Sequence, residues 1–453
     1  MRKTLKSIVF FLTPNQLIVL GYFVSVILFT LLLALPVSQK EGGQLSLLDA
    51  LFTATSGISV TGLTVINTTE SFSLFGQIVL LMSFQVGGIG IMTLGTFVWI
   101  LFGKNITLSY RKLIMIDQNR RNLSGMVHLM RIVIGMALIF EAVGTAILGT
   151  YFWLAGYFET WQAAYYNALF HTISSYTNAG FDIYDTSLEM FAGDYFVQLI
   201  TIMLIFLGAI GFPVIMEVRE YLWGKHEHFR FSLYTKVTTS IFFILLFSGA
   251  LGIWMMEDQL YMADKSWHEK LFYALFNSVT TRSGGLATMD VGEFSTPTQL
   301  FMSFLMFIGA SPSSVGGGIR TTTFAVVILT LITFSLGKNE VRAFNRAIKQ
   351  VDIIKSFVVF STGCFLVFGS ILVLDVMESH KFPLMTLIFE VASAFGTCGL
   401  SMGITSELSV LGKAIIMCLM FIGRIGILSL LFLFKSKKPQ ESYAYPKEDL
   451  IIG

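Results

Sequence analysis

The sequence predicts an all-α membrane protein built from four related helical units. Three observations lead to this fold class. Of the 453 residues, 54% are hydrophobic and only 13% are charged, which is typical of a chain whose solvent is lipid. Eight apolar segments are long enough to cross a bilayer. A short phrase containing glycine occurs four times at wide intervals, which indicates an internal repeat.

The predicted spans divide into two per unit. They cover residues 16–36, 73–102, 127–155, 195–218, 237–256, 298–336, 353–377 and 410–434. The corresponding units are residues 1–110, 111–230, 231–345 and 346–453, the last of which includes a C-terminal tail.

The sixth span is too long for one crossing and predicts a broken helix. The interruption consists of Ser311, Pro312, Ser313, Ser314, Val315, Gly316, Gly317 and Gly318. No helix would carry such a run unbroken, so we expect an intramembrane loop at residues 311–319. The run could be a kink that only lets helices pack. Three consecutive glycines favour a segment that moves, as a gate does.

Between the two spans of each unit lies a segment in which a glycine is followed by Leu or Phe. The four segments are Val60-Thr61-Gly62, Asn178-Ala179-Gly180, Ser283-Gly284-Gly285 and Thr397-Cys398-Gly399. Each is preceded by an amphipathic run too short to span, which predicts half-membrane helices at about 50–58, 165–175, 271–280 and 385–394. Each unit is therefore expected to be a helix, a short helix with its glycine segment, and a second helix.

The positions of Lys and Arg predict the orientation. The segments 1–6, 103–126, 219–236, 337–355 and 435–453 hold 21 of them, whereas 37–72, 156–194, 257–296 and 378–409 hold five. This asymmetry places both termini in the cytoplasm. All four glycine segments then enter from the outside, as a pore with pseudo-fourfold symmetry requires.

The glycine segments have the chemistry of a cation pathway. A cation entering hydrocarbon must exchange its water oxygens for protein oxygens, and backbone carbonyls provide them without fixed charge. Glycine lets the extended backbone come close to the ion, and the short helices can point their negative C-terminal ends at it. A single segment of this kind would more often be a turn or a close helix contact. Four copies favour an ion selectivity filter.

At these residues the sequence resembles the Trk/Ktr/HKT superfamily of potassium transporters, and within it the Ktr-type pore-forming membrane subunit. The likeness rests on the four glycine segments, on the run from Gly316 to Thr323, and on Phe421 to Gly426. It implies a potassium-channel-like fold of four M1-P-M2 repeats, whose filter carbonyls bind potassium as the transported ion. It also implies a gating loop below the filter, and Gly62 is what potassium-permeable members carry there.

The resemblance further implies partners. Family members form homodimers in the cell membrane, and a cytoplasmic ring of nucleotide-binding regulatory subunits docks on loops such as 104–121 and 338–355. No stretch of this chain is long enough for a dinucleotide fold of ~120 residues, so nucleotide is expected only through that separate subunit, and no cofactor on this chain. The basic loops also suit membrane lipid. Sodium assistance stays open.

Arg424 and several acidic groups stand at membrane depth. The resemblance places Arg424 opposite the intramembrane loop as part of the gate; the alternative is a structural bond to a carbonyl or to Glu390. Glu141, Glu390, Asp375 and His171 suit a structural role or, alternatively, a proton relay.

Other function classes fit less well. An ion-coupled carrier for a larger solute would use inverted repeats, whereas these four units run in one direction. An enzyme is not expected, because H-E-x-x-H, G-x-S-x-G and G-x-x-x-x-G-K-[ST] are absent. A nucleic-acid binder is excluded by 30 basic against 28 acidic residues with no basic face.

Overall fold

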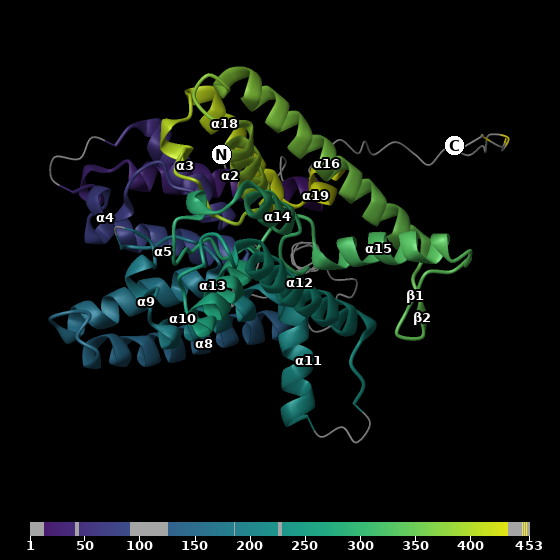
Figure 1. Cartoon of the computed structure of the whole chain (residues 1–453), viewed down its shortest axis with the longest axis horizontal. Coiled ribbons are helices and arrows are strands. Elements are labelled where there is room, and N and C mark those ends of the chain that lie inside the picture. Colours follow the sequence, from purple (N-terminus) through teal and green to yellow (C-terminus); the bar gives the residue numbers. More distant parts are fainter. Residues whose placement is uncertain are drawn as a thin grey trace, which may run out of the picture.

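Long helices alternate with short ones along the chain, and together they form one helical bundle (Figure 1). The computed structural model describes residues 13–40, 45–90, 126–184, 186–224 and 229–433, together with residues 446, 448 and 450. Residues 91–102 of the predicted span 73–102, most of the basic segment 103–126 and nearly all of the C-terminal tail lie outside these ranges.

The first two predicted units are entirely helical where they are described. The first contains α2 (Pro14–Leu33), η1 (Pro36–Ser38), α3 (Leu47–Ser59), α4 (Thr68–Ser71) and α5 (Leu74–Ile89). The second contains α8 (Met126–Leu154), α9 (Trp161–Thr177), η2 (Glu189–Phe191), α10 (Tyr195–Ala209) and α11 (Phe212–Trp223). Hydroxyl N-caps begin several of these helices; for example, the Ser46 side chain accepts the Asp49 N–H at the start of α3.

The third unit differs from the others by a long interruption and a small hairpin. It contains α12 (Leu233–Glu257), α13 (Trp267–Thr280), η3 (Val291–Glu293), α14 (Thr296–Phe307), α15 (Thr321–Ser335) and the strands β1 (Arg342–Ala343) and β2 (Arg346–Ala347). The two strands pair antiparallel. The fourth unit contains α16 (Gln350–Glu378), α17 (Leu384–Gly396), η4 (Thr405–Glu407), α18 (Val410–Ile425) and α19 (Ile427–Leu433).

The four half-membrane helices expected from the sequence lie inside α3, α9, α13 and α17, which begin and end slightly beyond them. The interruption of the sixth span is wider than expected. Helix α14 already ends at Phe307 and α15 begins only at Thr321. We call residues 308–320 the intramembrane loop from here on.

Two spans that the sequence predicts as continuous, 195–218 and 410–434, are sharply bent. Helices α10 and α11 meet at 102°, and α18 and α19 meet at 99°. The bends occur at Gly211 (φ 99°) and Gly426 (φ 87°), and α5 also ends on a glycine of this kind, Gly90 (φ 96°). A left-handed glycine cannot continue a helix, and α11 then begins at Phe212 with Pro213 in its first turn, a position that suits proline.

The number of spans in the described residues is lower than the eight expected. Four helices, α2, α8, α12 and α16, are long and apolar enough to cross a membrane, and each bent pair counted as one span would make up to six. Helix α5 is shorter and ends at Ile89, before Gly90, and α14 and α15 are separated by the intramembrane loop. Eight spans therefore stay a prediction.

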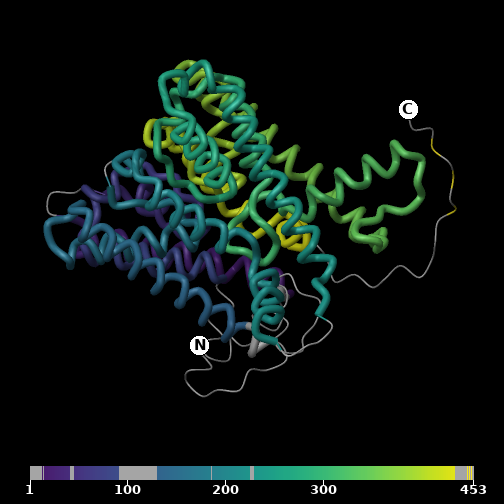
Figure 2. Tube along the Cα trace, turned by 60° about the horizontal axis from the view of Figure 1, so that its bottom comes forward, coloured from purple at the N-terminus to yellow at the C-terminus, as the bar shows by residue number. Residues whose placement is uncertain are grey.

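The units pack in a closed cycle. The helix after each glycine segment packs against the short helix of the next unit, and the pairs are α5 with α9, α10 with α13, α14 with α17, and α18 with α3. The hydrophobic clusters also join neighbouring units of this cycle. Phe84 of α5 packs against Phe170 of α9, and Phe52 of α3 packs among residues of α17 and α18. Helices α15 and α16, with the hairpin between them, extend away from this cycle as an arm (Figure 2).

Candidate functional site: a glycine ring above an intramembrane loop

The four glycines of the repeated segments form a ring at the centre of the cycle. A methyl group added to any of them would lie between 2.8 and 3.3 Å from the Cα of the next glycine, in the order Gly62, Gly180, Gly285, Gly399 and back to Gly62. All four have positive φ, between 70° and 100°. Only glycine combines this backbone conformation with such close approach. The structure therefore brings together the four segments that the sequence predicts.

Each short helix ends in a left-handed turn that directs the chain into the ring. Val60, Asn178 and Thr397 have φ of 56°, 55° and 49°, and the residue after each donates its N–H to a carbonyl of the preceding helix. This pattern satisfies carbonyls that a helix end leaves open. Val60 and Thr397 are β-branched, for which this conformation is strained. Strain of this kind persists only where the surroundings impose it.

The third segment reaches the ring differently. Helix α13 ends in a right-handed cap at Thr281, and the left-handed residue is Ser283, with φ of 82°. Arg282 is fully buried beside it, with its guanidinium carbon 6.0 Å from the centre of the Phe242 ring. Within the described part of the chain, none of its guanidinium nitrogens has a hydrogen-bond partner.

A hydroxyl on each short helix holds the glycine segment that follows it. The Ser56 and Ser393 hydroxyls accept the N–H groups of Gly62 and Gly399, both at 3.1 Å. In the other two units the hydroxyl donates instead. The Ser174 hydroxyl donates to the Phe181 carbonyl at 2.5 Å, and Thr280 donates to the Leu286 carbonyl at 2.7 Å.

The hydrogen bonds from Gly62 and Gly399 also orient the carbonyls. In a trans peptide the N–H and the preceding C=O point in opposite directions. When Gly62 N–H is bonded outward to its own helix, the Thr61 carbonyl must point inward. The Thr61 oxygen accordingly lies close to Gly180 and Gly399 of the ring, so the ring can present oxygens to a central cation.

A polar cavity of about 620 Å³ opens on one side of the ring, and all four ring glycines line it. Asp182, Glu189 and Asp290 are among the other lining residues, and none of the lining residues is Lys or Arg. Such a vestibule concentrates cations, because a concave surface lined by one sign of charge attracts ions of the opposite sign.

The intramembrane loop lies against the other side of the ring. A methyl group on Gly316 would lie 2.7 Å from the Ser283 Oγ, and one on Gly317 would lie 2.5 Å from the Thr397 Oγ1. The Ser283 hydroxyl in turn donates to the Thr397 carbonyl at 2.6 Å. The loop thus touches the third and fourth glycine segments directly.

Helices from the second, third and fourth units hold the loop. Backbone N–H groups of Ser311 and Val315 donate to the carbonyls of Ala209 and Gly208 at the end of α10, at 3.1 and 3.2 Å. Gly318 N–H donates to the Gly423 carbonyl of α18 at 3.2 Å. The Tyr234 hydroxyl of α12 donates to the Pro312 carbonyl at 2.6 Å.

Arg424 joins the loop to the first unit. Its Nη1 donates to the Val315 carbonyl and, at 3.3 Å, to that of Gly316. Its Nη2 donates to the carbonyls of Gly87 and, at 3.1 Å, Gly88 near the end of α5. The contact to the loop agrees with the expected position opposite it, and the partners are carbonyls as in the structural alternative. In the described part of the chain, Glu390 accepts hydrogen bonds from Ser401 and Thr405 instead of from Arg424.

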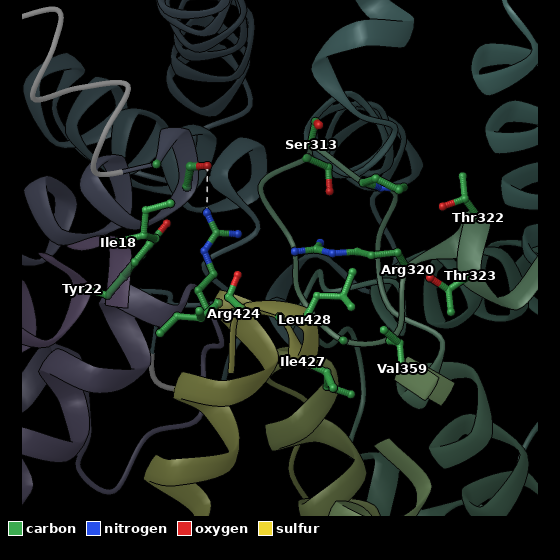
Figure 3. A pocket seen from close by; sticks show the side chains of 18 of the residues that line it. Ile18, Tyr22, Ser313, Arg320, Thr322, Thr323, Val359, Arg424, Ile427 and Leu428 are labelled. Atoms are coloured by element: carbon green, nitrogen blue, oxygen red, sulfur yellow. Dashed lines mark hydrogen bonds between the residues drawn. The ribbon is translucent and has the colours of Figure 1, made fainter. Parts of the chain in front are cut away.

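A second pocket, of about 160 Å³, lies beside Arg424 and the loop (Figure 3). Arg320 extends into it from the start of α15, and Tyr22 and Ser313 are also at its wall. The other buried polar groups named from the sequence lie elsewhere. His171 Nε2 is 2.8 Å from the Thr201 Oγ1, and Glu141 accepts from Gln85 Nε2 at 2.6 Å.

Sequence reasoning missed the four anchoring hydroxyls, the acidic residues of the vestibule and Arg320. A signal for the hydroxyls was present, because Ser56, Ser174 and Ser393 each precede their glycine by six residues and Thr280 precedes Gly285 by five. Arg320 belongs to the run used for the family resemblance but was given no role. No sequence signal marks Asp182, Glu189 and Asp290, which converge only through the fold.

Comparisons with known proteins all find cation transport proteins. The family model described as cation transport protein, TrkH, matches residues 13–445. The chain is 52% identical over 442 residues to the Ktr system potassium uptake protein D of Bacillus subtilis, covering 98% of each chain. It is 36% identical to the Ktr system potassium uptake protein B of the same organism, covering 97% of each.

Two more distant proteins, one compared by sequence and one by structure, are also similar to this chain. The chain is 32% identical over 447 residues to the potassium/sodium uptake protein NtpJ of Enterococcus hirae, covering 98% of each chain. The crystal structure of the potassium transporter TrkH from Vibrio parahaemolyticus superposes with a TM-score of 0.70 over 92% of this chain and 84% of that one, at 19% identity. These relatives are described as transport proteins, and the structural likeness supports the helical fold.

Proposed function

This chain belongs to the TrkH family of cation transport proteins, and from that membership we propose that it takes up potassium across the cell membrane. The ion passes through one pore per protomer, and the carbonyls of the ring segments select it. The observation that carries this proposal is the ring itself: four left-handed glycines, one from each unit, in mutual contact.

The filter consists of Val60, Thr61, Gly62, Asn178, Ala179, Gly180, Ser283, Gly284, Gly285, Thr397, Cys398 and Gly399. Its backbone oxygens replace the hydration shell of potassium, which would otherwise cost tens of kcal/mol to remove. The negative ends of α3, α9, α13 and α17 add favourable potential at the ring. The anchored peptide before Gly62 or Gly399 keeps its carbonyl in place without reorganisation when the ion arrives.

The gate consists of Ser311, Pro312, Ser313, Ser314, Gly316, Gly317, Gly318 and Arg424. In the proposed closed state the loop lies against Ser283 and Thr397 and closes the path below the ring, and Arg424 holds it there. Opening moves the loop away from Ser283 and Thr397. Glycine-rich backbone can do this at modest cost, because it has more than one accessible conformation.

The assembly follows from the same membership. Four M1-P-M2 units, residues 1–110, 111–230, 231–345 and 346–453, give eight spans with both termini in the cytoplasm. The protein is a homodimer, and its basic cytoplasmic loops contact lipid headgroups and a ring of nucleotide-binding regulatory subunits. All four short helices of the cycle end at one ring, which supports four units that cross the membrane in the same orientation.

The test is ion flux into liposomes that contain the purified chain, with potassium and sodium varied independently. We expect potassium flux that Gly62→Asp abolishes, because a side chain there meets Ala179 and Gly180. Intact flux in that variant, or no potassium flux in the wild type, would contradict the proposal. Potassium flux that requires sodium would identify coupled transport, and flux without sodium would identify a channel-like pathway.

A further inference from the structure

Arg320 is the charged residue of the pocket below the ring for which neither the sequence nor the proposed mechanism has a role. It is the last residue of the intramembrane loop and the N-cap residue of α15, and its side chain forms no capping bond. Its Nη1 donates instead to the Gly316 carbonyl, four residues back in the loop. In Figure 3 its guanidinium points toward that of Arg424 across the pocket.

The Gly316 carbonyl therefore accepts from two arginines on different helices. Arg424 approaches it from α18 at 3.3 Å, and Arg320 approaches it from the start of α15. A carbonyl has two lone pairs and can accept both. Gly316 is also the loop residue against Ser283 of the third glycine segment. The doubly held carbonyl thus lies where the loop meets the ring.

We infer that Arg320 is a second clamp of the gate, a positioning residue that holds Gly316 under the ring together with Arg424. The inference rests on the proposed function, because it needs the loop to be a gate. It predicts that opening breaks two charge-assisted bonds at one carbonyl.

Repulsion between the two guanidinium groups does not reverse this effect. Arg320 is the N-cap residue directly before α15 and Arg424 lies in α18, so both stay with these helices when the middle of the loop moves. Their repulsion is then similar with the loop in or out and largely cancels in the difference. The bonds to Gly316 exist only with the loop in place, so they decide the equilibrium.

The decisive experiment is rubidium flux into liposomes containing the purified chain alone, for the wild type, Arg320→Gln, Arg320→Lys, Arg424→Gln and the double glutamine variant. A hydrogen bond from a charged group contributes about 1.5–3 kcal/mol, so Arg320→Gln should raise basal flux about ten-fold. Lysine should restore part of the closure. The basal flux of the double variant should be higher than that of each single variant. Its fold-increase over the wild type should be smaller than the product of the two single fold-increases, because both arginines act on one carbonyl.

Two controls separate a clamp from a general defect. Arg131→Gln removes an exposed arginine of α8, outside the ring segments, the intramembrane loop and the basic cytoplasmic segments, and should leave flux unchanged. The potassium-to-sodium flux ratio of Arg320→Gln should match the wild type, because the ring is untouched; a merely structural defect would change that ratio or lower the thermal midpoint.

The outcomes are distinguishable. If Arg424→Gln raises flux and Arg320→Gln does not, Arg320 is not a second clamp of the gate, and the proposed function stands. If the Arg320 and Arg424 effects multiply fully, the shared carbonyl is not the point of action and the inference is overturned. If the wild type conducts no cation under any condition, the proposed function fails and the inference fails with it.

Discussion

The glycine ring and the intramembrane loop are both irregular backbone at the centre of a helical bundle, yet they are held in opposite ways. Each ring segment is anchored by the helix that precedes it, as when Ser393 accepts the Gly399 N–H six residues later. The loop is bound mainly by residues far away in the sequence, such as Gly208, Tyr234 and Arg424. Local anchors move with their segment, whereas distant ones move with other helices.

This difference in anchoring makes the ring segments rigid and lets the loop move. The geometry of a ring segment is preserved as long as its own short helix is intact, so small shifts between units leave the carbonyl positions in place. The position of the loop depends on how α10, α12 and α18 sit relative to one another. A force that shifts these helices can therefore displace the loop without deforming the ring. Four substitutions test the contrast, from the largest expected effect to the smallest.

The strongest test is Gly399→Ala in the ring. The methyl group would meet the Thr61 carbonyl and the Cα of Gly285 at 3.0 Å, and φ is 100°. Strained backbone alone costs about 1–3 kcal/mol, and the overlap with the Thr61 oxygen adds to it, so potassium flux in liposomes should fall about a hundred-fold or more. Gly403→Ala is the matched control, because Gly403 also has positive φ, 84°, but open space around it. Equal losses in both variants would mean that backbone strain, not ring packing, is responsible.

The next test is Arg424→Gln, which removes the charge of Arg424 from the proposed gate. Each bond from a charged donor contributes about 1.5–3 kcal/mol, so basal rubidium flux without any soluble partner should rise about ten- to hundred-fold. Arg424→Lys should give an intermediate flux, because lysine cannot reach Val315 and Gly87 together. A fall in flux for the glutamine variant would show that Arg424 supports conduction instead of closure.

A smaller effect is expected for Ser393→Ala, which removes a ring anchor. The lost neutral hydrogen bond is worth about 1 kcal/mol, so the potassium-to-sodium flux ratio should fall about five-fold, with basal flux unchanged. Ser335→Ala provides the control, since the Ser335 hydroxyl bonds only within α15. A rise in leak with constant selectivity would contradict the separation of ring and loop.

The smallest effect is expected for Tyr234→Phe, which deletes the hydroxyl that holds the Pro312 carbonyl. A single neutral bond contributes about 0.5–1.5 kcal/mol, so basal flux should rise about three-fold and selectivity should not change. Tyr221→Phe, on an exposed tyrosine of α11, should behave as the wild type. Altered selectivity in Tyr234→Phe would indicate that the loop also shapes the ring.

The sequence was sufficient for the ring segments because glycine before Leu or Phe recurs after each short amphipathic run. It was insufficient for the bends at Gly211 and Gly426, since a glycine within an apolar run is commonly a packing position and gives no sign of its φ. The partners of Arg424 in the first unit could not be predicted either. Gly87 is 337 residues away, and only the closed packing of the fourth unit against the first brings the two together.

The contact of Gly316 and Gly317 with Ser283 and Thr397 makes the innermost part of the ring and the loop competitors for one volume. Two ligands that exclude each other are thermodynamically linked, and the linkage is reciprocal. An ion resident at the foot of the ring weakens the docking of the loop by the same factor by which the docked loop weakens the ion. We therefore expect external potassium to act as an effector of its own pathway, with opening governed in part by the concentration of the transported ion.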